Sequence, residues 1–277
     1  MPLMRSGLVA LGALTMALPA VAADYQTAPA PVMSPKPVSL WTVTIGAEGR
    51  MLPEYEGGKD FRFSAVPIIR VAREGSEARF RSPRDSAGFA LIDTGHFRAG
   101  PGLKVKLGRK ESDSSDLIGL GNVDWTVEVG GFAEYWPTEW LRTRAEVRQG
   151  FNGHRGVIGE LTADVVMPVT SQITLSGGPR MVLASGAAVS PYFGVSAAQS
   201  IASGLPVYSA EGGVRSYGAG AQVNYKWAPR WASHVFIEYD RLAGSAGNSP
   251  LVTQRGTRDQ IQVGIGTTYS FDVKGLW

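Results

Sequence analysis

A strict alternation of side-chain type, ending in aromatic residues, marks the C-terminal segment of this sequence. Within residues 259–271 the even positions hold glutamine, glycine, threonine and serine, and the odd positions are Ile261, Val263, Ile265, Thr267, Tyr269 and Phe271. A side-chain period of two is typical of a β-strand with one apolar and one polar face. Apolar odd positions recur over residues 41–50, 61–73, 97–108, 141–151, 157–169 and 217–227. In an exported chain, such strands predict a transmembrane β-barrel with lipid outside and a polar lumen inside.

The first 22 residues predict a cleaved signal peptide. Arg5 gives a basic start, residues 7–19 form an apolar run, and Ala20-Val21-Ala22 is a small-residue cleavage site. The run is too short to cross a bilayer, and no later segment reaches the roughly 20 apolar residues of a membrane helix. We therefore expect membrane spans made of strands, with the barrel over residues 40–277.

Residues 23–39 separate the predicted cleavage site from the first strand and contain Pro29, Pro31, Pro35 and Pro37. Because it has few large apolar groups, this segment favours an extended conformation and cannot pack a core. A flexible periplasmic arm is the preferred interpretation, and a peptide-like docking motif is the alternative.

Composition narrows the function classes. The chain has 27 basic and 24 acidic residues, and loss of Arg5 with the signal leaves a net charge of +2, which argues against a nucleic-acid binder. The absence of cysteine excludes disulfides and thiolate metal sites. A soluble β-sandwich could share this composition, so the fold class depends on the strand pattern.

The connections between alternating segments differ in length. Long ones cover residues 52–60, 110–121, 186–212 and 244–258, and short ones cover 74–76, 137–139, the region of Thr170 and 228–230. Short periplasmic turns and long outer loops predict an all-β, antiparallel, up-and-down outer-membrane barrel of about 12 strands with both ends in the periplasm. Residues 78–93, interrupted by Pro83, are expected to form a short hairpin. As a loop or an irregular strand they would reduce the count to about ten.

Aromatic residues support this orientation. The strand ends assigned to the periplasm carry Trp41, Trp136, Trp140, Trp227, Trp231, Tyr269 and Phe271, and the opposite rim carries Phe61, Phe63, Phe151, Tyr217 and Tyr239. Two aromatic girdles are typical of a barrel that crosses two membrane interfaces. Aromatic anchors in a soluble sandwich are the alternative.

Charged residues occupy the face of several strands that should point into the lumen. The expected members are Lys104, Lys106, Glu128, Glu134, Arg142, Arg144, Arg148, Glu160 and Asp164. The expected cross-strand neighbours are Glu134 with Arg142, Glu128 with Arg148, Arg148 with Glu160, and Arg144 with Asp164. We expect these charges to fill and rigidify the barrel, and a selective ion path is the alternative.

An enzyme is not expected. A Ser-His-acid site needs a histidine within reach of a nucleophile, and the chain has only His96, His154 and His234. His234 shares a face with Glu238 and Asp240, but no serine partner is evident. The sequence shows neither metal-ligand spacing nor a phosphate-binding glycine loop, so no metal or cofactor is predicted.

Five stretches from the first strand to the last are distinctive: Pro53-Glu54-Tyr55-Glu56-Gly57, Gly153-His154-Arg155-Gly156, the block from Pro191-Tyr192-Phe193-Gly194-Val195-Ser196 to Ser203-Gly204-Leu205-Pro206-Val207-Tyr208, Asn248-Ser249-Pro250-Leu251-Val252, and Thr268-Tyr269-Ser270-Phe271. In them the sequence resembles the MipA/OmpV family of outer-membrane proteins, also called MltA-interacting proteins. The tail from Asp272 to Trp277 extends beyond the usual aromatic end of that family. Tyr269 and Phe271 are therefore the expected signal for the assembly machinery, with Trp277 as the alternative.

The resemblance implies an outer-membrane barrel of a Gram-negative bacterium, in contact with membrane lipids, lipopolysaccharide and the barrel assembly machinery. The name-giving member is described as a scaffold that links a murein-cleaving lytic transglycosylase to a murein synthase. This implies a non-catalytic role in peptidoglycan remodelling, and no catalytic residues carry over. A small-solute or ion channel and an adhesin are the alternatives.

Overall fold

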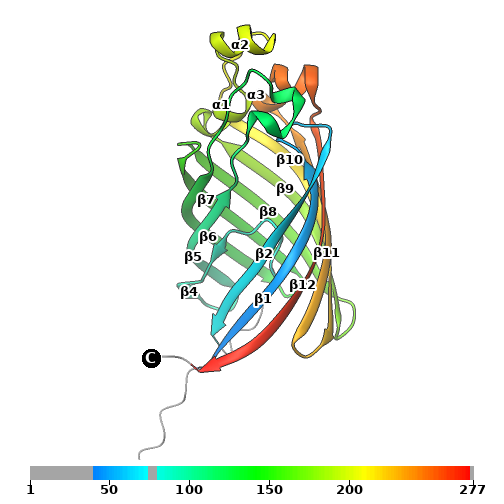
Figure 1. Cartoon of the computed structure of the whole chain (residues 1–277). Coiled ribbons are helices and arrows are strands. Elements are labelled where there is room, and N and C mark those ends of the chain that lie inside the picture. The colour runs from blue at the N-terminus through cyan, green and yellow to red at the C-terminus, as the bar shows by residue number, and fades with distance from the viewer. Residues whose placement is uncertain (1–39, 74–79, 275–277) are drawn as a thin grey trace, which may run out of the picture. The chain divides into compact units, whose positions relative to one another are not determined.

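The computed structural model describes residues 40–73 and 80–274, and antiparallel strands dominate it (Figure 1). The strands are β1 (Leu40–Pro53), β2 (Phe61–Arg73), β3 (Ala87–Gly88), β4 (Ile92–Asp93), β5 (Phe97–Lys106), β6 (Thr126–Thr138), β7 (Leu141–Asn152), β8 (Val157–Pro168), β9 (Ile173–Ala184), β10 (Gly213–Ala228), β11 (Trp231–Leu242) and β12 (Asp259–Lys274). The helices are α1 (Gly186–Phe193), α2 (Ala197–Ser203) and α3 (Gly244–Gly247), with short turns η1 (Glu111–Asp113), η2 (Ser115–Leu117) and η3 (Leu251–Arg255). The predicted signal peptide and arm lie outside the described residues.

One twelve-stranded antiparallel sheet forms the wall, in the order β2-β1-β12-β11-β10-β9-β8-β7-β6-β5-β3, and β4 also pairs with β5. The prediction of an up-and-down transmembrane barrel of about 12 strands is confirmed. Ten of these strands have 10 to 16 residues, and β3 and β4 have two each. The first and last long strands, β1 and β12, lie side by side, and β2 and β3 are the two edges of the sheet.

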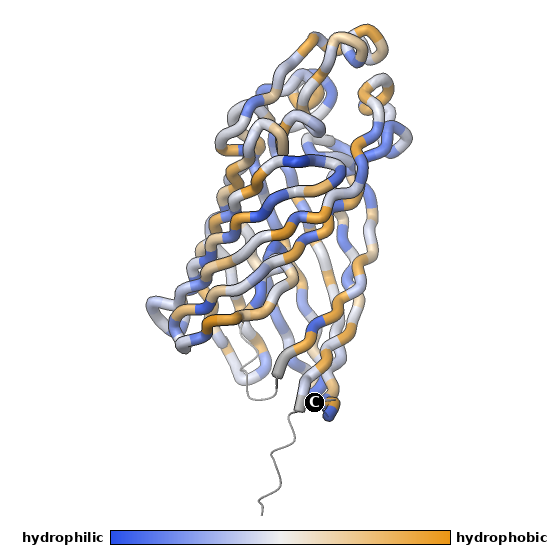
Figure 2. Tube along the Cα trace, turned by 90° about the vertical axis from the view of Figure 1, so that its left-hand side faces the viewer, coloured by the Kyte–Doolittle hydropathy of each residue, from blue (hydrophilic) through white to orange (hydrophobic). Residues whose placement is uncertain are grey.

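The alternation in the sequence decides which side chains point inward. In β7 every even position from Arg142 to Gly150 is buried, whereas Ala145, Val147 and Phe151 on the odd positions are exposed. The hydropathy colouring of Figure 2 shows polar and apolar residues alternating along the strands. A wall that is apolar outside and charged inside is the arrangement that a lipid environment requires.

The prediction for residues 78–93 was wrong in its pairing. β3 and β4 do not pair with each other, because Gly88 and Ile92 each pair with β5, opposite Gly102 and Ala99. The preceding residues, 80–86, leave the wall and turn into the lumen, and we call them the inward segment. Pro83 cannot donate a backbone hydrogen bond to a strand, which favours this departure. Residues 78 and 79 lie outside the described residues.

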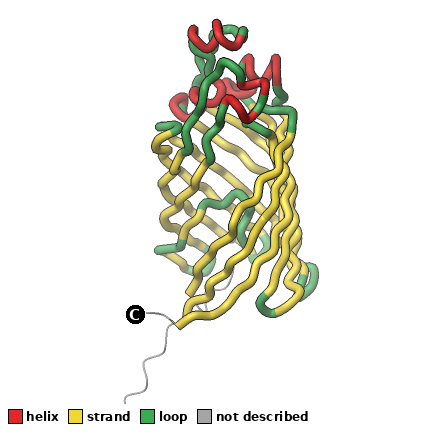
Figure 3. The backbone as a smooth tube through the Cα atoms, in the orientation of Figure 1, coloured by secondary structure: helices red, strands yellow, loops and turns green. Residues whose placement is uncertain are grey.

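The connections distinguish the two ends of the barrel. At one end β6–β7, β8–β9 and β10–β11 are joined by turns of a few residues, and at the other end lie the long connections that carry the helices (Figure 3). The short-turn end also holds the start of β1 and the end of β12, which makes it the periplasmic end. None of the helices in the described ranges is long and apolar enough to cross a membrane.

The outer loops pack into a cap over the mouth of the barrel. Ala188, Val189 and Phe193 of α1 are buried against Ile158 and Val182 of the wall. A second cluster consists of Tyr55, Leu117, Leu120, Val195, Leu205 and Leu251. The free carbonyl groups at the end of α1 are satisfied from neighbouring segments, because Arg109 donates to Tyr192 O at 2.7 Å and Ser249 donates to Phe193 O at 2.6 Å.

Aromatic side chains gather at the periplasmic end of the outer face. Trp231 stacks with Trp227 at a ring distance of 5.4 Å and contacts Tyr269 at 4.9 Å, and Tyr269 continues the row to Phe271 at 6.0 Å. Trp136 is an exception to the expected girdle. Its side chain is buried and donates to Glu134 Oε1 at 2.9 Å, because an even position of β6 faces the lumen.

Candidate functional site

Oppositely charged side chains bond to one another on the lumenal face of the wall, and we call this set the lumen lattice. Its members from the wall are Lys104, Glu128, Glu134, Arg142, Arg144, Glu146, Arg148, Glu160, Asp164, Arg180, Glu238 and Asp240. Arg142 and Asp164 are fully buried (0% exposed). A buried charge is tolerated only where other groups compensate it, so the density of partners explains how so many charges occupy one barrel.

Arg142 lies at the periplasmic end of the lattice. Its guanidinium donates to Glu134 Oε2 at 2.8 Å and to Asp164 Oδ2 at 3.1 Å, across the strands on either side. A further hydrogen bond of 2.7 Å reaches Asp85 Oδ2 of the inward segment. Arg142 therefore ties β7 to three other elements with one side chain.

Arg148 occupies the equivalent position further along the same strand. It donates to Glu128 at 2.9 Å and to Glu160 at 2.9 Å, and it also pairs with Glu146. Glu128 in addition accepts a hydrogen bond from His154 Nε2 at 3.2 Å, since Nδ1 of the same ring accepts from the backbone N–H of Gly156. Both acidic neighbours expected for Arg148 are bound to it.

The backbone register differs from the expected one by two residues. Glu134 pairs with Arg144 rather than Arg142, and Arg148 pairs with Gly130 and Ile158. On the β6 side the turn lies at residues 139–140 instead of 137–139, which moves the pairing by three residues, and an irregularity between Tyr135 and Thr138 takes one of them back. The structure describes no ion pair of Arg144 with Asp164, because Arg144 binds Glu134 at 3.2 Å and Glu146 at 2.5 Å.

The two lysines have different places. Lys104 joins the lumen lattice through Glu160, at 3.4 Å, and donates to the backbone carbonyl of Arg84 at 3.0 Å. Lys106 lies under the cap, where it pairs with Glu56 at 3.0 Å and sits 3.5 Å from the ring centroid of Tyr192. Lys106 was predicted to belong to the lattice of the wall. It lies two residues beyond Lys104 towards the outer mouth, and its ion-pair partner is Glu56 of the β1–β2 loop.

The cap carboxylate Glu56 is held by two cations, Lys106 at 3.0 Å and Arg215 at 3.5 Å. Burial alone would raise the pKa of Glu56, but the charges of Arg215 and Lys106 outweigh it and lower the pKa from 4.5 to about 2. Glu56 belongs to one of the distinctive stretches of the sequence, and it connects the β1–β2 loop to β5 and β10.

The inward segment supplies the contacts that sequence reasoning missed. Arg84 donates to Glu160 at 2.8 Å, to Asp240 at 2.5 Å and to Glu238 at 3.2 Å. Asp85 accepts from Arg142, and the Ser86 backbone N–H donates to Glu146 at 3.2 Å. A run of charged residues beside Pro83 was the available signal, because such a run cannot continue a lipid-facing strand.

The Gly153-His154-Arg155-Gly156 stretch forms the turn between β7 and β8. A side chain at Gly156 would come within 2.2 Å of the Ala188 backbone N, so glycine is needed where this turn meets α1. The turn directs His154 inward, where it is 2% exposed and bonded to Glu128. This stretch therefore joins the cap to the lumen lattice.

The other two histidines also have structural partners. His96 Nδ1 lies 2.9 Å from Trp136 O, and His234 Nε2 lies 2.5 Å from Glu48 Oε2. Within the described ranges, no histidine ring hydrogen-bonds a serine or threonine hydroxyl, and no group of three or more His, Asp or Glu side chains is arranged to hold a metal ion.

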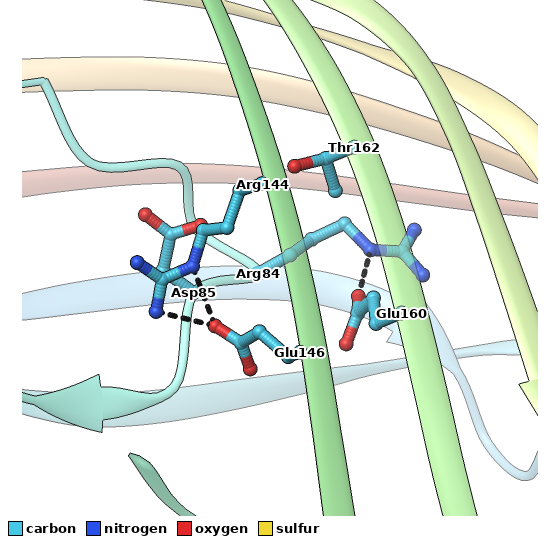
Figure 4. Close-up of a pocket in the computed structure, with 6 residues that line it drawn as sticks. All are labelled: Arg84, Asp85, Arg144, Glu146, Glu160 and Thr162. Carbon is cyan, nitrogen blue, oxygen red and sulfur yellow. Dashed lines mark hydrogen bonds and ion pairs between the residues drawn. The ribbon is translucent and has the colours of Figure 1, made fainter. Parts of the chain in front are cut away.

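A small cavity, with room for about one water molecule, lies where the inward segment meets β7 and β8. Its lining residues are Arg84, Asp85, Arg144, Glu146, Glu160 and Thr162 (Figure 4). Arg84 enters from the inward segment and points towards Glu160, while Arg144 points towards Glu146. The hydroxyl of Thr162 is buried and has no hydrogen-bond partner among the described residues.

Comparison with protein families gives one match, to the family described as MltA-interacting protein MipA, over residues 45–271. The chain belongs to the MipA family. The matched range runs from the first strand almost to the end of the last, so the MipA match includes the wall, the cap and the lumen lattice. Family membership and the transmembrane sheet place this MipA-family protein in the bacterial outer membrane.

Solved structures of other outer-membrane barrels are similar to this MipA-family chain at low identity. An outer-membrane channel from Pseudomonas putida F1 is 11% identical with a TM-score of 0.46, covering 88% of this chain and 100% of the channel. The NanC porin is 11% identical with a TM-score of 0.41, covering 83% of this chain and 98% of the porin. OprG from Pseudomonas aeruginosa is 9% identical with a TM-score of 0.29, covering 84% and 97%. Similarity this distant carries no argument about function. The comparison with curated proteins gave no match.

Proposed function

We propose that this protein is a non-catalytic scaffold of the outer membrane that binds murein-remodelling enzymes at its periplasmic end. The observation that carries the proposal is the filling of the lumen. Arg142 and Arg148 bond to both neighbouring strands, and Arg84 and Asp85 of the inward segment bond to the wall from within. A barrel crosslinked in this way is suited to presenting a rigid surface rather than to passing solutes.

The cap at the outer end of the barrel also supports a rigid scaffold. Phe193 and Val189 of α1 pack against the mouth of the barrel, and beneath it Glu56 links the β1–β2 loop to Lys106 of β5 and Arg215 of β10. The barrel is therefore stiffened at both ends, which favours a fixed platform for protein partners.

The chemistry of the partners follows from the family. A lytic transglycosylase is the first expected partner, because the family is described as MltA-interacting, and a murein synthase is the second. Both work on the cell wall beneath the outer membrane. The binding surface would consist of the short turns at residues 139–140, 169–172 and 229–230, together with the proline-rich arm.

The test is retention of purified periplasmic enzymes on the immobilised barrel in detergent. We expect a lytic transglycosylase to be retained by the mature chain, and retention to fall when residues 169–172 are replaced by glycine and serine and the arm is removed. Ile201→Ser is the matched control, because Ile201 is 89% exposed on α2 at the opposite end, and this variant should retain the enzyme fully.

Planar-bilayer recording separates the scaffold from the channel alternative. A filled lumen predicts conductance close to that of the bare membrane. Failure of both murein enzymes to bind, together with a steady conductance whose ion selectivity changes in Arg148→Ala, would show that the protein is a channel instead.

A further inference from the structure

Three carboxylates from two separate strands converge on the single guanidinium of Arg84. Glu160 comes from β8, and Glu238 and Asp240 come from β11, with two strands between them in the sheet. Their distances to the guanidinium are 2.8, 3.2 and 2.5 Å. A planar cation with several N–H donors fits such an arrangement, since each carboxylate accepts a charge-assisted hydrogen bond.

The segment that supplies Arg84 is not part of the sheet. Side chains of the wall make its contacts, because Lys104 donates to Arg84 O, Glu146 accepts from Ser86 N, and Arg142 donates to Asp85. Withdrawal of residues 80–86 would therefore break ion pairs but no strand pairing. The wall therefore binds the Arg84 side chain through polar contacts alone, as it would bind a separate ligand.

The three carboxylates would be short of positive charge without Arg84. Glu160 would keep Arg148 and Lys104, but Glu238 would have only Arg180, at 3.7 Å, and no other ion pair of Asp240 is described. The second oxygen of Asp240 is already buried without a hydrogen-bond partner. Uncompensated buried carboxylates favour uptake of a cation.

Thr162 gives a second and independent indication that the place receives a polar ligand. Its hydroxyl is buried (residue 8% exposed), lines the small cavity next to Arg84 and Glu160, and has no hydrogen-bond partner among the described residues. Buried polar groups are nearly always paired, so an unused hydroxyl at a cavity wall points to a missing partner. The space that the Arg84 side chain fills adjoins this cavity.

We propose that Glu160, Glu238 and Asp240 form a lumenal binding site for guanidinium and alkylammonium cations, which Arg84 occupies as a tethered ligand. A free cation of this class enters by displacing Arg84, and Thr162 provides an additional acceptor beside it. The site is independent of the periplasmic surface that binds murein enzymes, so either can fail without the other.

The experiment is a calorimetric titration of the purified barrel with ethylguanidinium chloride, with sodium chloride at equal ionic strength as the reference. Arg84→Ala should bind ethylguanidinium saturably and about tenfold or more tighter than the unaltered chain, because a tethered competitor acts at millimolar or higher effective concentration. Adding Asp240→Asn to Arg84→Ala should abolish this binding. Arg241→Ala is the matched control, because Arg241 pairs with Asp259 on the exposed face and its loss should create no site.

Three results would overturn the proposal: no saturable binding to Arg84→Ala, equal binding to the unaltered chain, or binding that survives Asp240→Asn. Should Arg84→Ala not fold, Arg84→Met keeps the aliphatic stem and is held to the same outcomes. The unaltered chain gives a further test by hydrogen exchange. Ethylguanidinium, but not sodium, should accelerate exchange of the Asp85 and Ser86 amides, and unchanged exchange would contradict displacement of Arg84.

Discussion

Arg148 and Glu128 are bound at 2.9 Å although they do not face each other in the sheet. In the backbone pairing Arg148 lies opposite Gly130, and Glu128 lies opposite Gly150. The long side chain of arginine spans the diagonal between these positions, which is about 7–8 Å from backbone to backbone. The same side chain reaches Glu160 diagonally on the other flank, where its backbone partner is Ile158.

Removal of Arg148 should destabilise the barrel strongly. Arg148→Ala leaves Glu128, Glu146 and Glu160 near one another without their shared cation, and the expected loss is about 3–5 kcal/mol in the free energy of unfolding. Glu128→Gln added to Arg148→Ala should recover part of this loss, because the effects of bonded partners are not additive. A urea titration followed by heat-modifiable migration on a gel measures both quantities.

An exposed pair provides the control for this prediction. Arg241 and Asp259 are bonded at the outer end with more than a third of each side chain exposed, so Arg241→Ala should destabilise the barrel far less than Arg148→Ala. Additive effects at Arg148 and Glu128, no larger than this control, would mean that the lumen charges are hydrated and independent.

On the lipid-facing side of β12, the loss of stability caused by an arginine should be largest at the centre of the membrane and smaller near its surfaces. Ile265 is 63% exposed and lies four residues from both Ile261 and Tyr269, near the middle of the strand. Ile265→Arg should therefore destabilise the barrel by about 2–4 kcal/mol, whereas Ile261→Arg near the outer rim should cost about 0–1 kcal/mol. Equal costs in a folding titration into lipid would contradict the placement of Ile265 at the membrane centre.

Assembly should depend on the aromatic end of β12. Phe271 pairs with Val43 of β1 and stacks on Tyr269, so Phe271→Ser removes an aromatic anchor from the strand that joins β1 and β2 to the rest of the sheet. We expect less folded protein in the outer membrane and more unfolded chain in the periplasm, measured by heat-modifiable migration. Trp277→Ser is the comparison, and a loss confined to that variant would make Trp277 the assembly signal.

The cap should loosen in acid because of Glu56. Its folded pKa of about 2 lies below the ordinary value of 4.5, so the stabilisation is present above pH 4.5 and is lost as the pH falls from there towards 2. The groups facing Glu56 are Lys106, Arg215 and His154. Hydrogen exchange of the α1 amides, corrected for the intrinsic rate, should rise over this range. Glu56→Gln should show fast exchange already at neutral pH, and an unchanged pH profile in that variant would contradict the assignment.

The sequence predicted the strands and their faces because both depend on local pattern. β7 and β12 were correctly placed by the period of two alone, and parity identified Arg142 and Arg148 as lumenal. The register was wrong by two residues, because the β6–β7 turn lies at residues 139–140 rather than 137–139 and is flanked by an irregularity that no pattern reveals. The charge partners of Arg148 were nevertheless correct, because arginine reaches both of the diagonal positions.

The inward segment could not be predicted in the same way. Arg84 and Asp85 are adjacent in sequence, yet they bind carboxylates and an arginine that are between 57 and 156 residues away. These contacts form only when distant strands of the wall come together around the segment. Pro83 favours a segment outside the sheet, because it lacks a backbone N–H, but it does not specify which strands the segment contacts.

The pairing of β1 with β12 imposes an order of events on folding. The side chains of Thr42 and Asp272 are hydrogen-bonded across 230 residues of chain. Bringing such distant positions together carries a large loop-closure entropy, which is recovered only once the intervening strands are aligned. The N-terminal strand is the first to leave the export channel and among the last to find its second neighbour. Throughout that interval the second edge of β1 keeps its backbone N–H and C=O groups unpaired, which leaves this strand open to pairing with other chains.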